Sequence, residues 1–217
     1  DIDTLLSARP RVLYLCSPNN PTGALVARDA IERAIAETTG VIFIDEAYAE
    51  FAGVSSVDLI ARSDRLLVIR TMSKAFGLAG LRVGYAVGNP ALVLEVEKSR
   101  GPYKLNALAE CVAMAALRED RAWVAEHVEL AVQNRERLAS ELVRAGIVSM
   151  KSHANFLCAP VAECVAVGQA LRARGVAVRP FPSLPGVGDA VRISIGPWTA
   201  MERFLDAFGP ALREVHG

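Results

Sequence analysis

The chain has 217 residues, 52% of them hydrophobic, with 24 basic and 24 acidic side chains and no net charge. This length suits one large domain or two modest ones, and the apolar content can fill a sizeable core. Balanced charge argues against nucleic acid or an anionic membrane surface as a partner. No apolar run reaches the roughly 20 residues of a membrane-spanning helix.

The cysteines and histidines do not follow the spacing of a metal site. Cys16, Cys111, Cys158 and Cys164 are scattered, without the close pairs that bind zinc, and the three histidines lie far apart. We interpret the cysteines as buried, reduced thiols of a cytoplasmic protein and expect no metal.

The first half of the chain has the pattern of a mostly parallel α/β domain. Four short apolar runs predict buried strands at residues 12–17, 41–45, 66–70 and 83–88. Their continuous apolar character is typical of a sheet covered on both faces. A helical pattern at 27–38 separates the first two runs, and strand, helix, strand is the order of a parallel crossover.

The second half predicts a small α+β domain. A long helical pattern covers 106–145, is broken near 118–121 and ends at Gly146. After it we expect, in order, a strand at 155–161, a helix at 162–175, strands at 176–181 and 191–196, and a helix at 199–215. We place the domain boundary near residue 119, which gives domains of 1–119 and 120–217.

Polar motifs follow the first two predicted strands. "SPNNPTG" carries Asn20 just beyond the first strand, and "IDEAY" ends the second strand with Asp45, Glu46 and Tyr48. In an extended segment Asp45 and Glu46 point to opposite faces, so they do not suit an acid–base pair. Taken alone, the first motif would be interpreted as a structural turn. For the second motif, a solvated helix cap is an equal alternative.

A lysine follows the third strand among small and hydroxyl-bearing neighbours. In "TMSKAFGLAGLRVGY", Lys74 stands with Thr71, Ser73 and Arg82. A desolvated lysine has a lowered pKa, and its neutral amine can form a Schiff base with an aldehyde. The hydroxyls and the arginine suit a phosphate. By itself, Lys74 would be interpreted as an exposed loop residue.

The three motifs together match the needs of one cofactor, pyridoxal 5'-phosphate. Its aldehyde requires a lysine, its ring nitrogen a carboxylate, its phenolic oxygen hydrogen-bond donors, and its phosphate hydroxyls and an arginine. The motifs resemble those of fold-type I aminotransferases of class I/II, most closely the histidinol-phosphate aminotransferase branch. The resemblance extends over essentially the whole chain and implies a PLP-transferase-like fold, here a partial large domain followed by the small domain.

The resemblance also implies a role for each residue. Lys74 would bind the cofactor and shuttle a proton, Asp45 would keep the ring nitrogen protonated, and Asn20 and Tyr48 would bind the phenolic oxygen. Thr71, Ser73 and Arg82 would hold the phosphate. Arg192 in "VRISIG" would bind the substrate carboxylate, and Arg179 in "VRPF" would bind a second anion on a phosphorylated substrate. For Arg179, an outward-facing strand arginine remains an equal alternative.

The chain also departs from the family. Family members have roughly another domain's length before "SPNNPTG", including an aromatic residue stacked on the cofactor and a lid over the substrate. We therefore expect a fragment that is poorly active or inactive alone. We also expect the strands flanking 41–45 and 66–70 to be absent, which would leave sheet edges and apolar faces uncovered. "RGPYKL" resembles a family "PYN" segment but has Lys104 where asparagine is frequent.

The leading hypothesis is transamination between histidinol phosphate and 2-oxoglutarate by a homodimer in its complete form. An aromatic amino acid aminotransferase or a phospho-amino-acid decarboxylase of the same fold remains an alternative. From another class of protein, the chain could be the ligand-sensing domain of a regulator. Release of carbon dioxide, or a DNA-binding module before the chain, would distinguish these alternatives.

Overall fold

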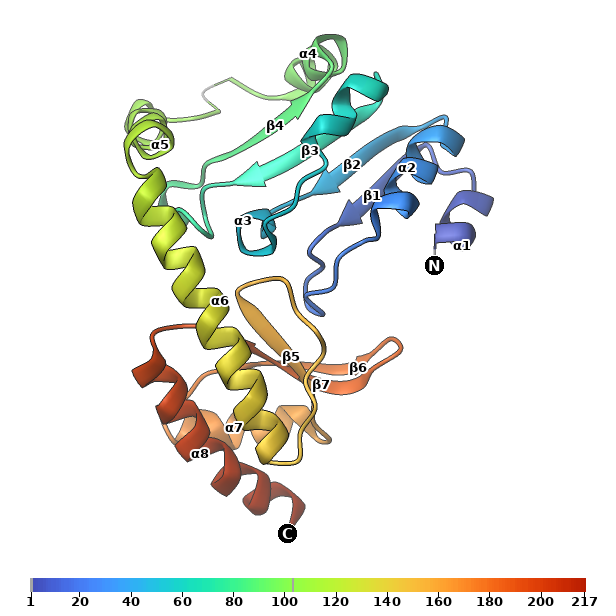
Figure 1. Ribbon diagram of the computed structural model, residues 1–217. Helices are drawn as coiled ribbons and strands as arrows, with labels where there is room; N and C mark the ends of the chain where they lie inside the picture. Colours follow the sequence, from blue (N-terminus) through green and yellow to red (C-terminus); the bar gives the residue numbers. More distant parts are fainter. Residues whose placement is uncertain (1, 103) are drawn as a thin grey trace. The chain divides into compact units, whose positions relative to one another are not determined.

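The computed structural model describes residues 2–102 and 104–217, and the chain divides into two compact units (Figure 1). The first unit comprises the chain up to Asn19 together with Leu25–Glu126. The second comprises Asn20–Ala24 together with His127–Gly217. The observed division therefore falls inside helix α6 (Arg121–Arg144) and assigns one short loop to the second unit. The assignment of 1–119 and 120–217 as domains stays a prediction.

The first unit contains four strands at the places that the apolar runs predict. They are β1 (Val12–Cys16), β2 (Val41–Asp45), β3 (Leu66–Thr71) and β4 (Gly84–Gly88). Its helices are α1 (Ile2–Ser7), α2 (Arg28–Glu37), α3 (Ala49–Ala52), α4 (Pro90–Ser99) and α5 (Ala107–Glu119), with 3-10 helices η1 (Val57–Arg62) and η2 (Ala79–Leu81). The crossover helix and the break between α5 and α6 are confirmed. The short elements α1, α3, η1 and η2, and helix α4, were not expected from the sequence.

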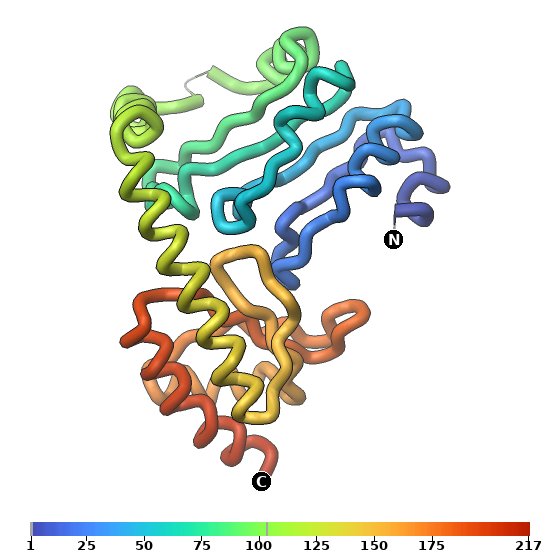
Figure 2. The backbone as a smooth tube through the Cα atoms, viewed as in Figure 1, coloured from blue at the N-terminus to red at the C-terminus, as the bar shows by residue number. Residues whose placement is uncertain are grey.

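The sheet of the first unit has the order β1-β2-β3-β4. The first three strands are parallel, and β4 runs antiparallel to β3, so a mostly parallel sheet is confirmed. The expectation that strands flanking β2 and β3 are absent is wrong, because β2 lies between β1 and β3, and β3 lies between β2 and β4. The turn after β3 brings the chain back as β4 (Figure 2). Strand β4 thus flanks β3 where we expected no strand.

The two faces of this sheet differ in cover. One face packs against α2 and η1 in a core that includes Ile42, Ile44 and Leu66 with Ile31 and Leu59. On the other face the outer strand β1 leaves Val12 58% and Tyr14 55% exposed. The expectation that this chain leaves apolar faces of its sheet uncovered is therefore confirmed for β1 within the described residues. Apolar runs predict a strand, but they do not say which segment supplies its second layer.

Helix α5 supports the turn between β3 and β4. Its alanines Ala109, Ala113 and Ala116 are buried against Met72 and Val83, which lie at the two ends of that turn. Alanines at this helical spacing line one face, and their small side chains let the turn approach the helix closely. The backbone N–H of Met72 also donates to the Val83 carbonyl at 3.1 Å. The turn that carries Lys74 is thus packed against helix α5 at both of its ends.

The second unit is a small α+β unit, as predicted. Its antiparallel sheet has the order β5-β7-β6, made of β5 (Phe156–Pro160), β6 (Arg179–Leu184) and β7 (Gly188–Ser194). Helices α7 (Cys164–Ala173) and α8 (Trp198–His216) contribute with the end of α6 to its core. None of the helices among the described residues is long and apolar enough to cross a bilayer.

Strand β6 begins at Arg179 rather than at residue 176 as expected. Gly175 adopts a left-handed φ of 76° after α7, and the N–H of Val176 donates to the Leu171 carbonyl at 3.0 Å. This pattern is that of a Schellman motif, which ties the first residues after a helix to its last turn. Residues 176–178 are therefore a connection, and the strand starts after them.

Candidate active site

The carboxyl ends of the parallel strands define the candidate site in the first unit. Asp45 is the last residue of β2, and Lys74 lies in the turn directly after β3. Because β2 and β3 are parallel neighbours, their carboxyl ends lie at the same edge of the sheet. Ligands of open α/β sheets bind at this edge. The structure therefore brings the expected acid and the expected amine to one edge.

The Asp45 carboxylate is held by two hydrogen bonds. Its Oδ1 accepts from the backbone N–H of Ala47 at 3.0 Å, and its Oδ2 accepts from the hydroxyl of Tyr14. In the β1–β2 register Tyr14 is the partner of Phe43 and Cys16 the partner of Asp45, so Tyr14 and Asp45 are diagonal neighbours on one face. Burial of the hydroxyl end, then the hydrogen bond to Asp45, raises the pKa of Tyr14 above its ordinary value.

Tyr14 is a site residue that sequence reasoning missed. It lies in an otherwise aliphatic strand, and only the register of β1 against β2 places its hydroxyl at Asp45. The signal that the sequence offered was a single polar-tipped residue two positions before the end of β1. That position shares a face with the strand end, because side chains alternate along a strand.

Tyr48 and Lys74 lie together. Tyr48 is the residue before α3, and only 5% of it is exposed. The Nζ atom of Lys74 is 5.3 Å from the centroid of the Tyr48 ring, within the range of a cation–π contact. Lys74 itself is an exposed side chain of the described structure. The amine is thus accessible and has an aromatic neighbour that is fixed by burial.

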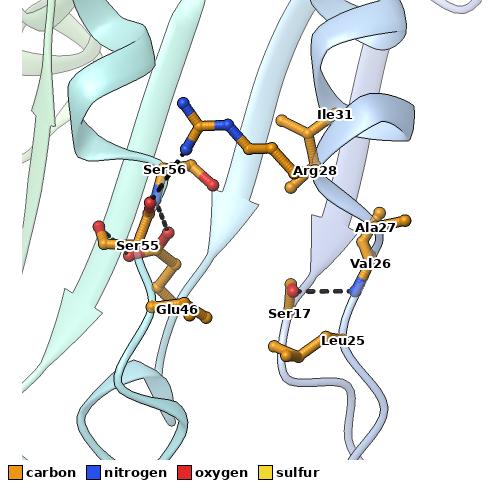
Figure 3. Close-up of a pocket in the computed structure, with 10 residues that line it drawn as sticks. Ser17, Leu25, Val26, Ala27, Arg28, Ile31, Glu46, Ser55 and Ser56 are labelled. Carbon is orange, nitrogen blue, oxygen red and sulfur yellow. Dashed lines mark hydrogen bonds between the residues drawn. The ribbon is translucent and has the colours of Figure 1, made fainter.

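Glu46 turns away from Asp45 and anchors the segment that carries Tyr48. It is 2% exposed, and its carboxylate accepts from the hydroxyl of Ser55 at 2.8 Å and from the N–H of Ser56 at 2.5 Å (Figure 3). Arg70 on β3 pairs with Glu46 at 2.9 Å and with Glu50 at 2.8 Å. The opposite orientation of Asp45 and Glu46 is confirmed. The ion pairs tie the loop after β2 to the next strand.

A cavity of about 500 Å³ lies beside this anchor and is separate from the acid and the amine. Figure 3 shows its lining, in which the Ser17 hydroxyl accepts from the N–H of Val26 at 3.0 Å. It is lined by Ser17, Leu25, Val26, Ala27, Arg28, Ile31, Glu46, Val54, Ser55 and Ser56. Its buried carboxylate, Glu46, already has its partners in Ser55, Ser56 and Arg70. Neither Asp45 nor Lys74 lines this cavity.

The residues expected to hold a phosphate share the turn after β3. The Thr71 Oγ1 accepts from the N–H of Ser73 at 3.1 Å and donates to the Val83 carbonyl at 3.4 Å. Arg82 has a left-handed φ of 56°, and its guanidinium donates to the Ala79 carbonyl at 3.0 Å. Arg82 is therefore exposed and bound to its own turn. Its role as a phosphate ligand stays a prediction.

The expected carboxylate-binding arginine lies in the second unit with Asn20. The Arg192 Nη1 donates to the Oδ1 of Asn20 at 2.7 Å, and the guanidinium carbon is 5.1 Å from the centroid of the Phe156 ring. The Nε of Arg192 is buried and has no hydrogen-bond partner among the described residues. A buried donor without a partner is costly, so an additional acceptor would stabilise this side chain.

Arg179 and Arg192 are direct cross-strand neighbours. They are partners in the β6–β7 register, while Cys158 faces Arg192 from β5. Burial raises the pKa of the Cys158 thiol, so this neighbour stays neutral and offers no counter-charge. Like charges directly opposite each other repel. The pair of cations therefore favours an anion on this face of the sheet.

Two further residues bear on the expected motifs. Lys104, at the position where the resemblance led us to expect asparagine, forms an ion pair with Glu97. Together with Arg100, it lowers the pKa of the Glu97 carboxyl through hydrogen bonds. Tyr103, of the same segment, lies outside the described residues. Within the described ranges no group of three or more histidine, cysteine, aspartate or glutamate side chains could hold a metal ion.

The described side chains fit pyridoxal phosphate by their chemistry. The set contains an accessible amine at Lys74, a carboxylate at Asp45 and an aromatic hydroxyl at Tyr48, all on one edge of one sheet. The Thr71 and Ser73 turn adds hydroxyls and the Arg82 guanidinium adds a cation. Each functional group of the cofactor thus has a partner of the required type in the chain.

Comparison with known proteins gives a consistent result. The family model for aminotransferase class I and II matches residues 1–208. A histidinol-phosphate aminotransferase of Thermoanaerobacter pseudethanolicus is 37% identical over 211 residues, which is 95% of this chain and 60% of that protein. The chain therefore spans about 60% of the length of this curated relative.

Solved structures share the fold. A histidinol-phosphate aminotransferase of Clostridium acetobutylicum superposes with a TM-score of 0.89 at 25% identity, over 99% of this chain and 68% of that one. A histidinol-phosphate aminotransferase of Sinorhizobium meliloti, solved with pyridoxal-5'-phosphate, gives a TM-score of 0.89 at 24% identity over 99% and 62%. The similarity covers both units of the chain.

Proposed function

Because the chain belongs to the aminotransferase class I and II family, we propose that it forms part of a pyridoxal 5'-phosphate-dependent aminotransferase. The observation that supports this most is the carboxylate of Asp45 and the amine of Lys74 at one edge of the sheet, on adjacent parallel strands. The chain spans 60% of a curated relative. We therefore assign the activity to a protein that contains this chain together with the part of the relative's length that the chain does not span. We call it the full-length protein below.

Bound at this edge, the cofactor would supply an aldehyde for the substrate amine and a ring that withdraws electrons from the reacting carbon. The Asp45 carboxylate would hold the positive charge at the ring nitrogen, and the amine of Lys74 would accept and return the proton of the substrate carbon. Tyr48 and Asn20 would donate hydrogen bonds to the ring oxygen. Thr71, Ser73 and Arg82 would bind the phosphate.

The substrate is bound through its anions. The planar guanidinium of Arg192 can hold a carboxylate through two parallel hydrogen bonds, which an ammonium cannot do. Its neighbour Arg179 adds a second positive charge on the same face. A phosphate on the donor and a carboxylate on the acceptor both suit this pair of cations. We therefore favour histidinol phosphate, which the names of the relatives also suggest, as the donor. We favour 2-oxoglutarate as the acceptor and a homodimer as the complete form.

Turnover by the full-length protein tests the proposal. We expect transfer of the amino group to 2-oxoglutarate, measured as glutamate formed, and no activity in Lys74→Ala. The matched control is Lys98→Ala, which removes an exposed lysine that pairs with Glu95 on α4. Full activity of Lys74→Ala would contradict the proposal, and so would release of carbon dioxide in place of transfer. The isolated 217-residue chain should be poorly active.

Arg179→Leu tests the choice of donor. If Arg179 binds phosphate, this variant raises KM for histidinol phosphate by roughly tenfold to a hundredfold, as expected for losing a charged hydrogen bond, and leaves KM for an unphosphorylated aromatic donor unchanged. An equal change for both donors would favour an aromatic aminotransferase. Light scattering of the full-length protein tests the homodimer.

A further inference from the structure

The hydroxyl of Tyr14 is committed to the Asp45 carboxylate. It donates to Oδ2, while Oδ1 accepts from the N–H of Ala47 at 3.0 Å. One donor therefore comes from the loop after β2 and the other from the neighbouring strand β1. Two donors from different directions fix the plane of a carboxylate, which otherwise rotates freely about its terminal bond.

The position of Tyr14 is set by strand pairing and not by a flexible loop. Tyr14 is paired with Phe43 in the parallel β1–β2 register, one alternation before the pair Cys16 and Asp45. Both side chains therefore lie on the same face, and the long tyrosine side chain spans the diagonal between them. A site whose partner side chain is carried by a strand is held more accurately than one carried by a loop.

The hydroxyl remains a donor over the working range of pH. Burial of its polar end and the negative charge of Asp45, with a smaller effect of Cys16, raise the pKa of Tyr14. Although 55% of the residue is exposed, the exposed surface belongs to a side chain whose hydroxyl already has an acceptor. Tyr14 thus stays protonated at neutral pH and does not add a second negative charge beside Asp45.

We propose that Tyr14 is a positioning residue that orients the Asp45 carboxylate toward the ring nitrogen of the cofactor. This inference rests on the proposed function. Tyr14 does not contact the reacting atoms, and it acts only through Asp45. Without the Tyr14 hydroxyl, the Asp45 carboxylate can rotate. Its stabilisation of the positive charge on the ring nitrogen is then weaker.

The first test needs no cofactor. In the 217-residue chain, carbon-13 NMR of labelled tyrosines follows each phenol with pH, and Tyr14→Phe identifies the signal of Tyr14. We expect Tyr14 to titrate above the ordinary value of about 10, and to return toward that value in Asp45→Asn. An ordinary titration that Asp45→Asn leaves unchanged would overturn the pairing, whatever the protein catalyses.

The second test uses the full-length protein loaded with pyridoxal phosphate. Tyr14→Phe keeps the ring and removes only the hydroxyl. Residues that support metal ligands typically change affinity or rate by about tenfold or more when removed, and we expect an effect of similar size here. We expect cofactor affinity and kcat each to fall about tenfold, with little change in KM for the amino donor. The midpoint of the pH-dependent visible absorbance of the bound cofactor should rise, because a less positive ring withdraws fewer electrons.

The matched control is Tyr85→Phe. Tyr85 lies on the opposite face of the same sheet, as the register partner of Arg70. This variant should keep the absorbance midpoint and kcat of the wild type. If Tyr14→Phe matches Tyr85→Phe in cofactor affinity, kcat and the absorbance midpoint, the positioning role is wrong while the proposed function stands. If the wild type binds no cofactor, the proposed function fails, and with it the role of Tyr14 toward the ring.

Discussion

Arg192 is the residue whose surroundings most directly support its proposed role in binding a carboxylate. Its Nη1 donates a hydrogen bond to Asn20, and its guanidinium lies near the ring of Phe156. Its Nε is buried and has no hydrogen-bond partner among the described residues. It also faces the like charge of Arg179. Such an arrangement is costly for a merely structural arginine, and a bound carboxylate would offset the cost.

We expect Arg192→Leu in the full-length protein to raise KM for 2-oxoglutarate, the substrate that carries carboxylates, roughly tenfold to a hundredfold, the effect of losing a charged hydrogen bond. Arg192→Lys should recover only part of this loss, since an ammonium lacks the planar fork. Steady-state kinetics with both substrates measure the effect. An unchanged KM for 2-oxoglutarate in Arg192→Leu would rule out this arginine as the carboxylate ligand.

At the scale of elements, the loop after β2 is fixed by an ion-pair network. Arg70 on β3 bridges Glu46 and Glu50, and all three side chains are largely buried. Removal of one partner from a buried ion pair leaves the other charge without compensation, which typically costs 3–5 kcal/mol. Loss of one member of the network should therefore destabilise the loop that carries Tyr48.

Arg70→Leu should lower the free energy of unfolding by about 3 kcal/mol, measured by urea denaturation of the 217-residue chain. Arg33→Leu is the control, because Arg33 forms only exposed ion pairs with Asp3 and Glu37. That variant should lose less stability than Arg70→Leu, because exposed ion pairs are screened by solvent. An equal loss of unfolding free energy in the two variants would show that burial does not make this network more important to stability than exposed ion pairs.

Gly23 closes the "SPNNPTG" loop in a way that only glycine permits. Its φ is 79°, its carbonyl accepts from the N–H of His153 at 2.8 Å, and an added Cβ would lie 2.1 Å from the Oγ and 2.8 Å from the Cα of Ser152. The backbone atom cannot move aside as a flexible side chain could. The glycine in this motif is thus required by a close approach within the second unit.

Gly23→Ala should lower the free energy of unfolding by about 3 kcal/mol, the sum of left-handed strain and overpacking. Gly53 has a similar φ of 67° but open space around the position of a Cβ. Gly53→Ala should therefore lose only about 1 kcal/mol, from strain alone. Thermal or urea unfolding compares the two, and a loss in Gly23→Ala no larger than in Gly53→Ala would contradict the close approach.

The sequence predicted the regular elements well where a long periodic or apolar pattern was present. Strands β1 to β4, the crossover helix and the break before α6 lie where those patterns place them. Strand β6 began late because the Schellman ending after Gly175 takes up three residues that look like a strand. Short elements such as α3 and η1 depend on tertiary packing, which local propensity does not encode.

The candidate site was predicted in part. Asp45 and Lys74 could be assigned to one edge because consecutive parallel strands end together. Tyr14 could not, since its partner is set by the register of β1 against β2, which a one-residue shift would reverse. The contact between Arg192 and Asn20 joins residues far apart in the sequence, and no local pattern indicates it.

For the whole molecule, the outer strand β1 leaves apolar side chains exposed on the face that carries Asp45. Val12 and Tyr14 are more than half exposed there. In a sheet with both faces covered, such positions would be buried. The relatives have additional length that this chain does not span. We therefore place catalysis in the full-length protein and expect the acid, the amine and their sheet to be retained there.

The most direct test of the account is the site of covalent capture. Full-length protein is incubated with pyridoxal phosphate at a low, equimolar concentration, reduced with borohydride and digested for mass spectrometry. We predict that, among Lys74, Lys98, Lys104 and Lys151, the phosphopyridoxyl group is found on Lys74, and that Lys74→Ala abolishes the adduct while Lys98→Ala retains it. An adduct distributed evenly over these lysines, or one that persists in Lys74→Ala, would contradict the account.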